Sequence, residues 1–324
     1  MGLLQDGEWV DRWYDTEESG GEFKRDTSKF RNWVTTEGDG ECSDDHPAES
    51  GRYHLYVSHA CPWAHRTLVF RALKGLEDHI GVSVVHPLML ENGWELRDGF
   101  PGATGDPLHG FDYVHQLYTR ADPACSGRVT VPVLWDRARD TIVSNESSEI
   151  IRMLNGAFDA VTGNTDDYYP EALRERIDTI NARVYSDVNN GVYKTGFATD
   201  QAVYERELRT LFAALDWLEG ILAESRYLCG DRMTEADWRL FTTLVRFDKV
   251  YVGHFKCNIR DLREYPALWA YTRDLYQHPG IAGTVHFDHI RTHYYASHRM
   301  INGSGIVPVG PEIDFDAPHG RNGA

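Results

Sequence analysis

Position 61 holds a cysteine where a thiol could act as a nucleophile. Cys61 follows a β-rich run and precedes an apolar-periodic helical run, and Pro62 takes the first helical position, where its missing N–H costs nothing. A thiol at this place lies at the positive end of the helix, near unbonded backbone N–H groups that favour the thiolate. The thiolate performs thiol–disulfide exchange. We therefore predict a reactive Cys61, the alternative being a buried and inert thiol.

Alanine stands where a second, resolving cysteine would follow Cys61. The segment Cys61-Pro62-Trp63-Ala64 cannot close an internal disulfide, so an external thiol would have to release any mixed disulfide at Cys61. His59 and His65 flank the cysteine, but no further ligand cluster lies nearby, so we expect no metal and expect His65 to pack within the helix. The scattered remaining cysteines fit free thiols in a reducing compartment, and we expect them to be inert: Cys42, Cys125, Cys229 and Cys257.

Two further segments offer contacts for a peptide with charged ends. Pro132 marks a strand edge or bulge, or else a cis Val131-Pro132 bond that presents the Val131 backbone to an extended peptide. Residues 144–147 end a strand and begin a helix, whose free N–H groups can bind a carboxylate while Glu146 pairs with an ammonium. A γ-glutamyl group carries both charges. A plain helix cap, with Asn145 capping and Glu146 in the first turn, fits these residues equally well.

The elements that position these residues form an α/β region followed by an all-helical one. Alternation and apolar periodicity predict strands at 52–57, 82–88, 129–135 and 141–143, and helices at 63–76, 146–154, 171–189, 201–224, 234–250 and 264–277. We divide the chain into an extended N-terminal arm over 1–48, an α/β domain over 49–157 with an insertion at 90–128, an all-α domain over 170–302 and a C-terminal tail over 303–324.

Composition limits the classes of function. The 324 residues include 33 Lys and Arg against 50 Asp and Glu, a formal charge of -17 that argues against nucleic acid as a partner. Neither a membrane span nor a signal peptide is visible, so we expect a cytoplasmic protein with no membrane partner. Only six of the 33 cations are lysine, which suggests a halophilic source. An ordinary acidic cytosolic enzyme has a similar composition.

Together, these features resemble the glutathione transferase superfamily. Cys61-Pro62-Trp63-Ala64, Val131-Pro132, Glu146-Ser147 and the helical second half carry the general resemblance. From about residue 30 to 311 the chain is similar to the xi class, the glutathionyl-hydroquinone reductases. The more specific segments are 189–198 (Asn-Asn-Gly-Val-Tyr-Lys-Thr-Gly-Phe-Ala), 236–241 (Ala-Asp-Trp-Arg-Leu-Phe), 254–258, 293–295 and 305–308. The resemblance implies a thioredoxin-like N-terminal domain, an all-helical C-terminal domain and a homodimer.

The resemblance also implies a reaction. Cys61 would attack the sulfur of a glutathionyl-hydroquinone, the hydroquinone would leave, and a second glutathione would release the resulting mixed disulfide. Tyr193, Tyr251 and Tyr294 would donate hydrogen bonds to the oxygens of the ring. The aspartate that matches Asp237 caps a helix and serves folding in the superfamily, so we leave it out of the site.

For the thiol peptide, the resemblance places Trp94 against glutathione and gives it the Val131 backbone as a partner. Glu146 and Ser147 would hold the γ-glutamyl end, and Arg128 would pair with a carboxylate. In a halophile the thiol could be γ-glutamylcysteine, which lacks the glycine carboxylate but keeps the γ-glutamyl end. The sequence leaves open which thiol is used and which quinone is the physiological substrate.

Other functions compete with the reductase. A general thioltransferase would reduce glutathione or γ-glutamylcysteine mixed disulfides, with the tyrosines only shaping its pocket. A conjugating transferase is disfavoured because a cysteine holds the place of the usual serine or tyrosine. A binding protein that keeps the fold without activity is possible in principle, because fold does not fix function. Retention of Cys61 and the three tyrosines counts against it.

Overall fold

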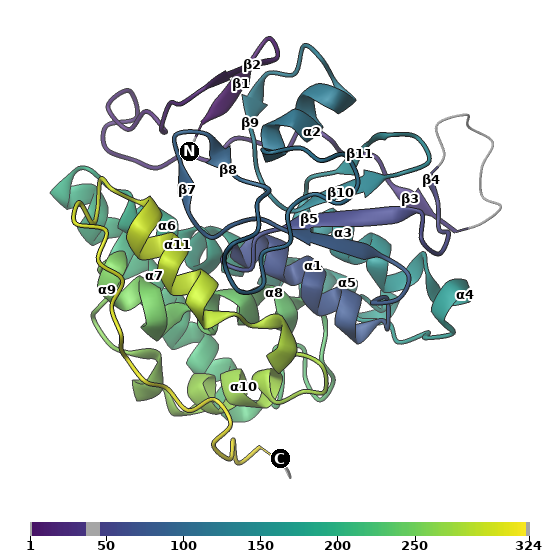
Figure 1. Ribbon diagram of the computed structural model, residues 1–324. Helices are drawn as coiled ribbons and strands as arrows, with labels where there is room; N and C mark the ends of the chain where they lie inside the picture. The colour runs from purple at the N-terminus through teal and green to yellow at the C-terminus, as the bar shows by residue number, and fades with distance from the viewer. Residues whose placement is uncertain (1, 37–45, 322–324) are drawn as a thin grey trace. The chain divides into compact units, whose positions relative to one another are not determined.

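The computed structural model describes residues 2–36 and 46–321 (Figure 1). By their internal contacts these residues form two compact units. The sheet unit contains Met1–Trp13, Asp26–Asp166 and Thr284–His293. The helical unit contains Tyr14–Arg25, Asp167–Gly283 and Tyr294–Ala324. The predicted domain boundaries stay predictions, since the units are defined by contacts and each is built from three segments.

A four-stranded sheet with the order β11-β10-β5-β6 forms the centre of the sheet unit. Its strands are β5 (Tyr53–Val57), β6 (Gly81–Val84), β10 (Val133–Asp136) and β11 (Thr141–Ser144), with β6 parallel to β5 and β10 antiparallel to both β5 and β11. Helices α1 (Pro62–Leu73) and α3 (Ser147–Gly156) contact each other. All five residues of β5 are buried, as expected of a central strand. The predicted order of strand, helix, strand, hairpin and helix is confirmed.

Prolines explain where the predicted strands were too long. The strand expected at 129–135 begins only at Val133, because the nitrogen of Pro132 has no hydrogen to donate to a neighbouring strand. The Val131-Pro132 peptide is cis. The cis alternative is therefore confirmed. The strand expected at 82–88 ends at Val84, shortly before Pro87. Helix α1 ends at Leu73 and not at Leu76, because the chain turns at Gly75 with a φ of 65°.

Part of the predicted arm is a hairpin. Strands β1 (Leu3–Gln5) and β2 (Glu8–Val10) are antiparallel, and β9 (Gly127–Arg128) pairs with β1. Asp6 and Gly7 make the turn with positive φ values of 48° and 85°, which is the favoured chemistry for a two-residue hairpin loop. The hairpin was missed in the sequence although Asp-Gly is its usual signal. Further along, β3 (Val34–Thr35) runs parallel to β4 (His46–Pro47).

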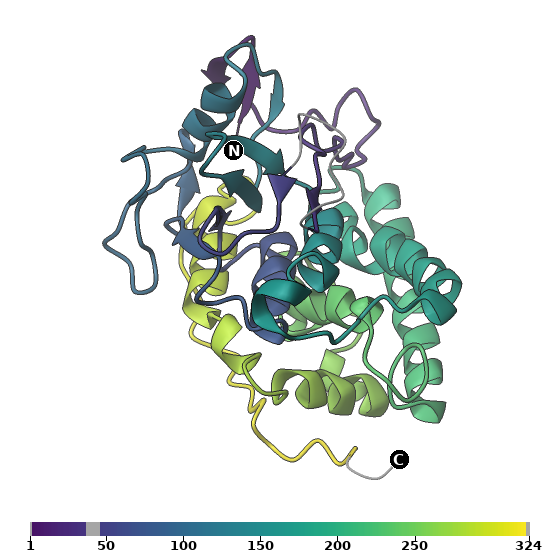
Figure 2. The ribbon, with the colours of Figure 1, turned by 90° about the vertical axis from the view of Figure 1, so that its right-hand side faces the viewer.

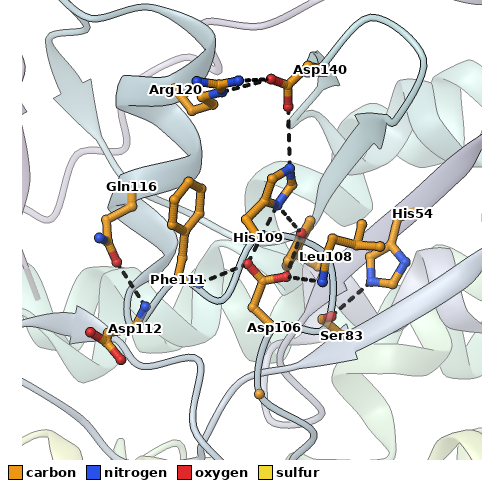
Figure 3. Close-up of polar contacts among 12 residues, drawn as sticks. His54, Ser83, Asp106, Leu108, His109, Phe111, Asp112, Gln116, Arg120 and Asp140 are labelled. Atoms are coloured by element: carbon orange, nitrogen blue, oxygen red, sulfur yellow. Dashed lines mark hydrogen bonds and ion pairs between the residues drawn. The ribbon is translucent and has the colours of Figure 1, made fainter.

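The insertion at 90–128 is not simply a loop. It carries the end of β7 (Met89–Leu90), β8 (Gly93–Trp94), helix α2 (Val114–Ala121) and β9. Its central carboxylate, on Asp106, accepts hydrogen bonds from the Tyr56 hydroxyl at 2.9 Å and from the backbone N–H groups of Leu108 and Phe111 (Figure 3). His109 lies between Asp106 and Asp140, with Nε2 3.3 Å from the Asp140 carboxylate. These contacts tie the insertion to β5 and to the β10–β11 turn.

The helical unit contains the teal-to-green helices of Figures 1 and 2. Helix α7 (Gln201–Glu224) matches its predicted bounds, and the Asp200 side chain caps it by accepting from Val203 N at 3.1 Å. The π-helical turns Val184–Asn189 and Phe247–Tyr251 interrupt the helices expected at 171–189 and 234–250. The other helices are α5 (Arg174–Arg183), α6 (Gly191–Gly196), α8 (Glu235–Leu244), α9 (Val252–His254) and α10 (Pro266–Tyr276), with short 3₁₀ turns at Glu171–Leu173, Leu262–Glu264 and Ala282–Thr284. Helix α4 (Asp159–Thr162) belongs to the sheet unit, and α11 (Phe287–Ser297) begins in the sheet unit and ends in the helical unit.

Helices α4 and α11 were not predicted, and α4 lies within the stretch 157–170 that lacks an apolar pattern. Among the described residues, no helix is both long enough and apolar enough to cross a membrane.

Asp237 holds the start of α8. Its fully buried carboxylate accepts four hydrogen bonds, from Leu228 N, Thr234 N, the Thr234 hydroxyl and the Tyr271 hydroxyl, at 2.7–3.0 Å. Burial raises the pKa of Asp237, and these hydrogen bonds oppose the shift. Asp237 therefore joins the beginning of α8 to α10 and has a structural role.

We predict that Asp237→Ala lowers the free energy of unfolding by about 3 kcal/mol, because it leaves several buried donors without an acceptor. Asp200→Ala is the matched control, since it removes an exposed helix cap at a cost of about 1 kcal/mol. Urea unfolding followed by circular dichroism measures both. Equal losses for the two variants would contradict the structural role given to Asp237.

Candidate active site

The Cys61 thiol lies at the start of α1. Cys61 is the N-cap residue in an extended conformation (φ -76°, ψ 121°), Pro62 is the first helical residue, and the Cys61 carbonyl accepts the first helical bond from His65 N at 2.9 Å. The Cys61 N–H donates to Ser58 O at 3.1 Å. The sulfur does not cap the helix and is partly exposed. The positive end of a 12-residue helix therefore faces a reachable sulfur, which favours the thiolate.

Val131 and Trp94 belong to the sheet unit, as Cys61 does. The Cys61 Sγ lies 3.5 Å from the Val131 carbonyl oxygen, immediately before the cis proline bond. Trp94, at the end of β8, is 7% exposed, and its ring stacks on the His293 ring with centroids 4.8 Å apart. Nδ1 of His293 is 3.0 Å from the Pro87 carbonyl oxygen, so the imidazole donates from that nitrogen. A backbone contact therefore fixes the ring on which Trp94 rests.

Glu146 and not Asn145 caps α3, so the alternative of a plain helix cap at Asn145 was wrong. The Glu146 carboxylate accepts from Ser148 N at 3.0 Å and from the Ser148 hydroxyl at 2.8 Å. The Asn145 side chain is used elsewhere: it accepts from Phe30 N and donates to the Tyr118 hydroxyl. These two partners come from the N-terminal segment and from α2. Contacts from distant parts of the chain thus decide which residue caps the helix.

The Glu146 carboxylate is held in its charged form. Burial, the largest single effect, raises its pKa, but the bonds from Ser148, the 2.9 Å bond from the Ser28 hydroxyl and the nearby Arg66 charge together lower it below its ordinary value. Arg66 is 1% exposed and donates to the Ser147 hydroxyl at 3.4 Å. A half-buried anion and a buried cation therefore lie at the start of α3. This arrangement can receive the ammonium and the carboxylate of an α-amino acid group.

Three tyrosines of the helical unit share a network of hydroxyl groups. The Tyr294 hydroxyl oxygen is 2.6 Å from that of Tyr193 and 3.0 Å from that of Tyr251. The Phe255 ring stacks on Tyr251 with centroids 5.6 Å apart and meets the other two edge-on. All three tyrosines are at least nine-tenths buried. Their side chains come from α6, a π-helical turn and α11, so only the fold brings them together.

Burial keeps Tyr251 and Tyr294 protonated. It raises the pKa of both well above the ordinary value for tyrosine, and the neighbouring Tyr193 adds to the shift. Neutral phenols are hydrogen-bond donors at physiological pH. The cluster can therefore donate to an oxygen atom that gains negative charge during a reaction.

Comparison with known proteins assigns the family. The models for the glutathione S-transferase N-terminal and C-terminal domains match residues 60–157 and 201–274. The chain is 58% identical to glutathionyl-hydroquinone reductase YqjG of Escherichia coli over 99% of both chains, and 53% identical to glutathionyl-hydroquinone reductase PcpF of Sphingobium chlorophenolicum over 96% of both. The glutathione-bound structure of YqjG superposes with a TM-score of 0.91 over 99% of both chains at 55% identity. A xi-class transferase from Natrialba magadii gives a TM-score of 0.91 at 51% identity, over 99% of this chain and 96% of the other.

The chain belongs to the xi class of glutathione transferases. The predicted fold class is thereby confirmed, with a thioredoxin-like N-terminal part and an all-helical C-terminal part. The roles that the resemblance gives to individual residues stay predictions. The structure brings Cys61, Val131, Trp94, Glu146 and Ser147 into the sheet unit and the three tyrosines into one cluster of the helical unit.

Arg128 has other described partners in this xi-class transferase. Its guanidinium donates to the backbone carbonyls of Arg12 and Trp13 and lies 3.9 Å from the Asp26 carboxylate. Arg128 thus fastens the segment that follows the N-terminal hairpin. Its pairing with a peptide carboxylate stays a prediction.

Three residues near the predicted site were missed in the sequence: Arg66, Ser28 and His293. Arg66 could have been recognised from the sequence, since an arginine on the apolar face of α1 needs a partner when it is buried. No sequence pattern marks Ser28 or His293 as site residues. They reach Glu146 and Trp94 from opposite ends of the chain, and their neighbours in sequence do not reveal such contacts.

The histidines beside Cys61 pack against other side chains. His65 is fully buried in α1, as predicted, and Nε2 lies 2.8 Å from the Thr284 hydroxyl. The His59 ring stacks on His286 with centroids 3.6 Å apart. Within residues 2–36 and 46–321, no group of three or more His, Cys, Asp or Glu side chains is arranged to hold a metal ion.

The other described cysteines are buried. Cys125, Cys229 and Cys257 are 2%, 7% and 0% exposed, and burial raises the pKa of each thiol. Cys42 lies outside the described residues.

We predict that iodoacetamide alkylates Cys61 at a pH well below that needed for Cys125, Cys229 or Cys257, and at least about tenfold faster at neutral pH. Peptide mass spectrometry of samples quenched over time follows each cysteine separately, Cys42 included. Unfolding in urea should bring the rates together, because it removes both the helix end and the burial. Equally slow alkylation of Cys61 in the folded protein would rule out an activated thiolate.

We predict that Glu146→Gln raises KM for glutathione about tenfold, because it removes a charge-assisted bond and keeps an oxygen that can still cap α3. The pKa of Glu146 is lowered from its ordinary value, so the group stays charged at neutral pH and the wild-type KM should rise only at acidic pH, where this carboxyl takes up a proton. Glu149→Gln is the control, since it makes the same charge change in the first turn of α3, at an ion pair with Arg31. A similar KM for the two variants would show that Glu146 does not contact the thiol.

Proposed function

We propose that this xi-class transferase reduces glutathionyl-hydroquinones through a mixed disulfide at Cys61. The observation that carries the proposal is a lone, partly exposed cysteine at a helix N-terminus, with Ala64 in the place of a resolving cysteine. A conjugating enzyme needs no such thiol. The names of the two curated relatives, both glutathionyl-hydroquinone reductases, support the same reaction.

The reaction proceeds in two exchanges. The Cys61 thiolate attacks the sulfur of the thioether, a sulfur–sulfur bond forms, and the carbon–sulfur bond breaks. The electron pair goes to the ring carbon, which takes up a proton to give the hydroquinone. A second glutathione thiolate then attacks the mixed disulfide, forming glutathione disulfide and restoring the Cys61 thiolate. One thioether and one glutathione thus become one hydroquinone and one disulfide.

The tyrosine cluster would act on the leaving ring. Negative charge on the ring carbon spreads to the ring oxygens, and Tyr193, Tyr251 and Tyr294 are neutral donors that can stabilise it. The high pKa of Tyr251 and Tyr294 supports this role, because a phenolate could not donate. We assign Tyr294 the central position, since its hydroxyl contacts both of the others.

For the thiol, we propose glutathione, held by Glu146 and Ser147 at its γ-glutamyl end and by Trp94, Val131 and Arg128 along its length. γ-Glutamylcysteine would keep the first of these contacts and is the alternative thiol. The glutathione-bound structure of YqjG favours glutathione. A homodimer, a cytoplasmic location and a halophilic source remain predictions.

Intact-mass measurement after incubation with each thiol disulfide tests the nucleophile and the thiol together. Wild type should gain about 305 Da from glutathione disulfide and Cys61→Ser should gain nothing, as cysteine exchange requires. A stable adduct only with the disulfide of γ-glutamylcysteine, lighter by one glycine residue, would select the alternative thiol. If neither disulfide labels wild type, Cys61 is not the nucleophile.

Turnover by Tyr294→Phe separates the reductase from a general thioltransferase. The variant should lose about a hundredfold in kcat on a glutathionyl-hydroquinone, which is the lower end of the loss that follows removal of one oxyanion donor. Its reduction of a mixed disulfide that has no ring should stay near the wild-type rate. Equal losses on both substrates would mean that the tyrosine supports the structure only.

A further inference from the structure

A strap made of residues 14–25 belongs to the helical unit although it comes from the N-terminal arm. Its contacts are specific. The Thr16 hydroxyl is 3.2 Å from the Thr199 hydroxyl, and Thr199 N donates to Gly21 O at 3.2 Å. Farther along, Arg206 of α7 forms an ion pair with Glu22 at 2.8 Å. The strap is therefore fixed on α7 and on the loop before it.

The end of the strap covers one of the three clustered tyrosines. The Phe23 ring is 6% exposed, with its centroid 5.3 Å from that of Phe197 and 6.3 Å from that of Tyr193. The guanidinium carbon of Arg25 lies 5.3 Å from the Tyr193 ring centre. Arg25 Nε donates to the Asn190 side-chain oxygen at 3.2 Å, at the start of the helix that carries Tyr193. Arg25 is thus oriented both by the ring and by the amide.

This geometry places a permanent positive charge beside Tyr193. A guanidinium stays protonated at any physiological pH, stacks on aromatic rings and presents several donors that match a carboxylate. The chain as a whole has a formal charge of -17, so its general field repels anions. A cation at the tyrosine cluster opposes that field where the ring of the substrate would bind.

We propose that Arg25 selects glutathionyl-hydroquinones whose ring carries a negatively charged substituent, such as a carboxylate. The proposal rests on the proposed function, in which Tyr193 donates to an oxygen of the ring. A ring held in this way brings its substituents next to the group that covers Tyr193. Arg25 takes no part in the bond changes, which remain those of the two thiol exchanges.

Two probes that differ only in charge test this selection. One is the glutathionyl adduct of a dihydroxybenzoate, and the other is the adduct of the corresponding dihydroxybenzamide, which has nearly the same shape. The readout is the ratio of kcat/KM for the acid over kcat/KM for the amide. Arg25→Gln should lower this ratio about tenfold, and Arg25→Lys should retain most of it, because lysine keeps the charge but loses the planar fork. Added salt should lower the wild-type ratio and raise the ratio of Arg25→Gln, because without the Arg25 charge only the repulsion by the general field is left for salt to screen.

Arg206→Gln serves as the control for the strap itself. It removes a cation that anchors the strap through Glu22 but does not lie over the Tyr193 ring. Its ratio should equal that of wild type even where its stability falls. The inference is overturned if Arg25→Gln lowers both probes equally, or if Arg206→Gln lowers the ratio as much. Failure of wild type to turn over either probe would instead refute the proposed function.

Discussion

The start of α1 determines where the Cys61 sulfur lies, and much of the sheet unit serves to hold that start in place. Strand β5 enters it with all five residues buried and with a partner strand on each side, so its end at Val57 cannot shift. The Ser58 carbonyl oxygen then accepts a hydrogen bond from Cys61 N, and the Ser58 hydroxyl accepts one from Ala60 N. The Val131 carbonyl oxygen, in the segment before β10, contacts the Cys61 sulfur. A reactive thiol needs a fixed position as well as a favourable field.

A second constraint is the pairing of opposite charges at the start of α3, where Arg66 is buried and Glu146 is half-buried. Glu146 caps the helix, and Arg66 reaches its first residue from α1. Each charge would be costly to bury alone, and their proximity offsets part of that cost. An amino acid group that binds there finds both charges already in place. Binding therefore needs little rearrangement of the protein, which is the usual advantage of a preorganised site.

The parts of the fold that could be predicted from the sequence are those with strong local patterns. Helix α7 was bounded correctly because its apolar periodicity runs between an aspartate cap and a clear end. The β1–β2 hairpin lacks such a pattern, and its remaining partner, β9, lies more than a hundred residues away. In the site, Cys61 was recognisable from its place before a helix. The clustering of Tyr193, Tyr251 and Tyr294 follows only from tertiary packing. The sequence could not decide which residue caps α3, because the Asn145 side chain is taken up by hydrogen bonds with Phe30 and Tyr118, which are distant in the chain.

The chain passes between the two units five times, because each unit is assembled from three separate segments. No single cut can therefore release one complete unit as a fragment. A shortened protein that begins at Arg52 would lack both the hairpin of the sheet unit and the strap of the helical unit. Exchange of halves between related transferases at one junction would likewise mix the segments of each core. The shortest continuous piece that contains the whole sheet unit is 1–293, and for the helical unit it is 14–324, so either piece also carries most of the other unit.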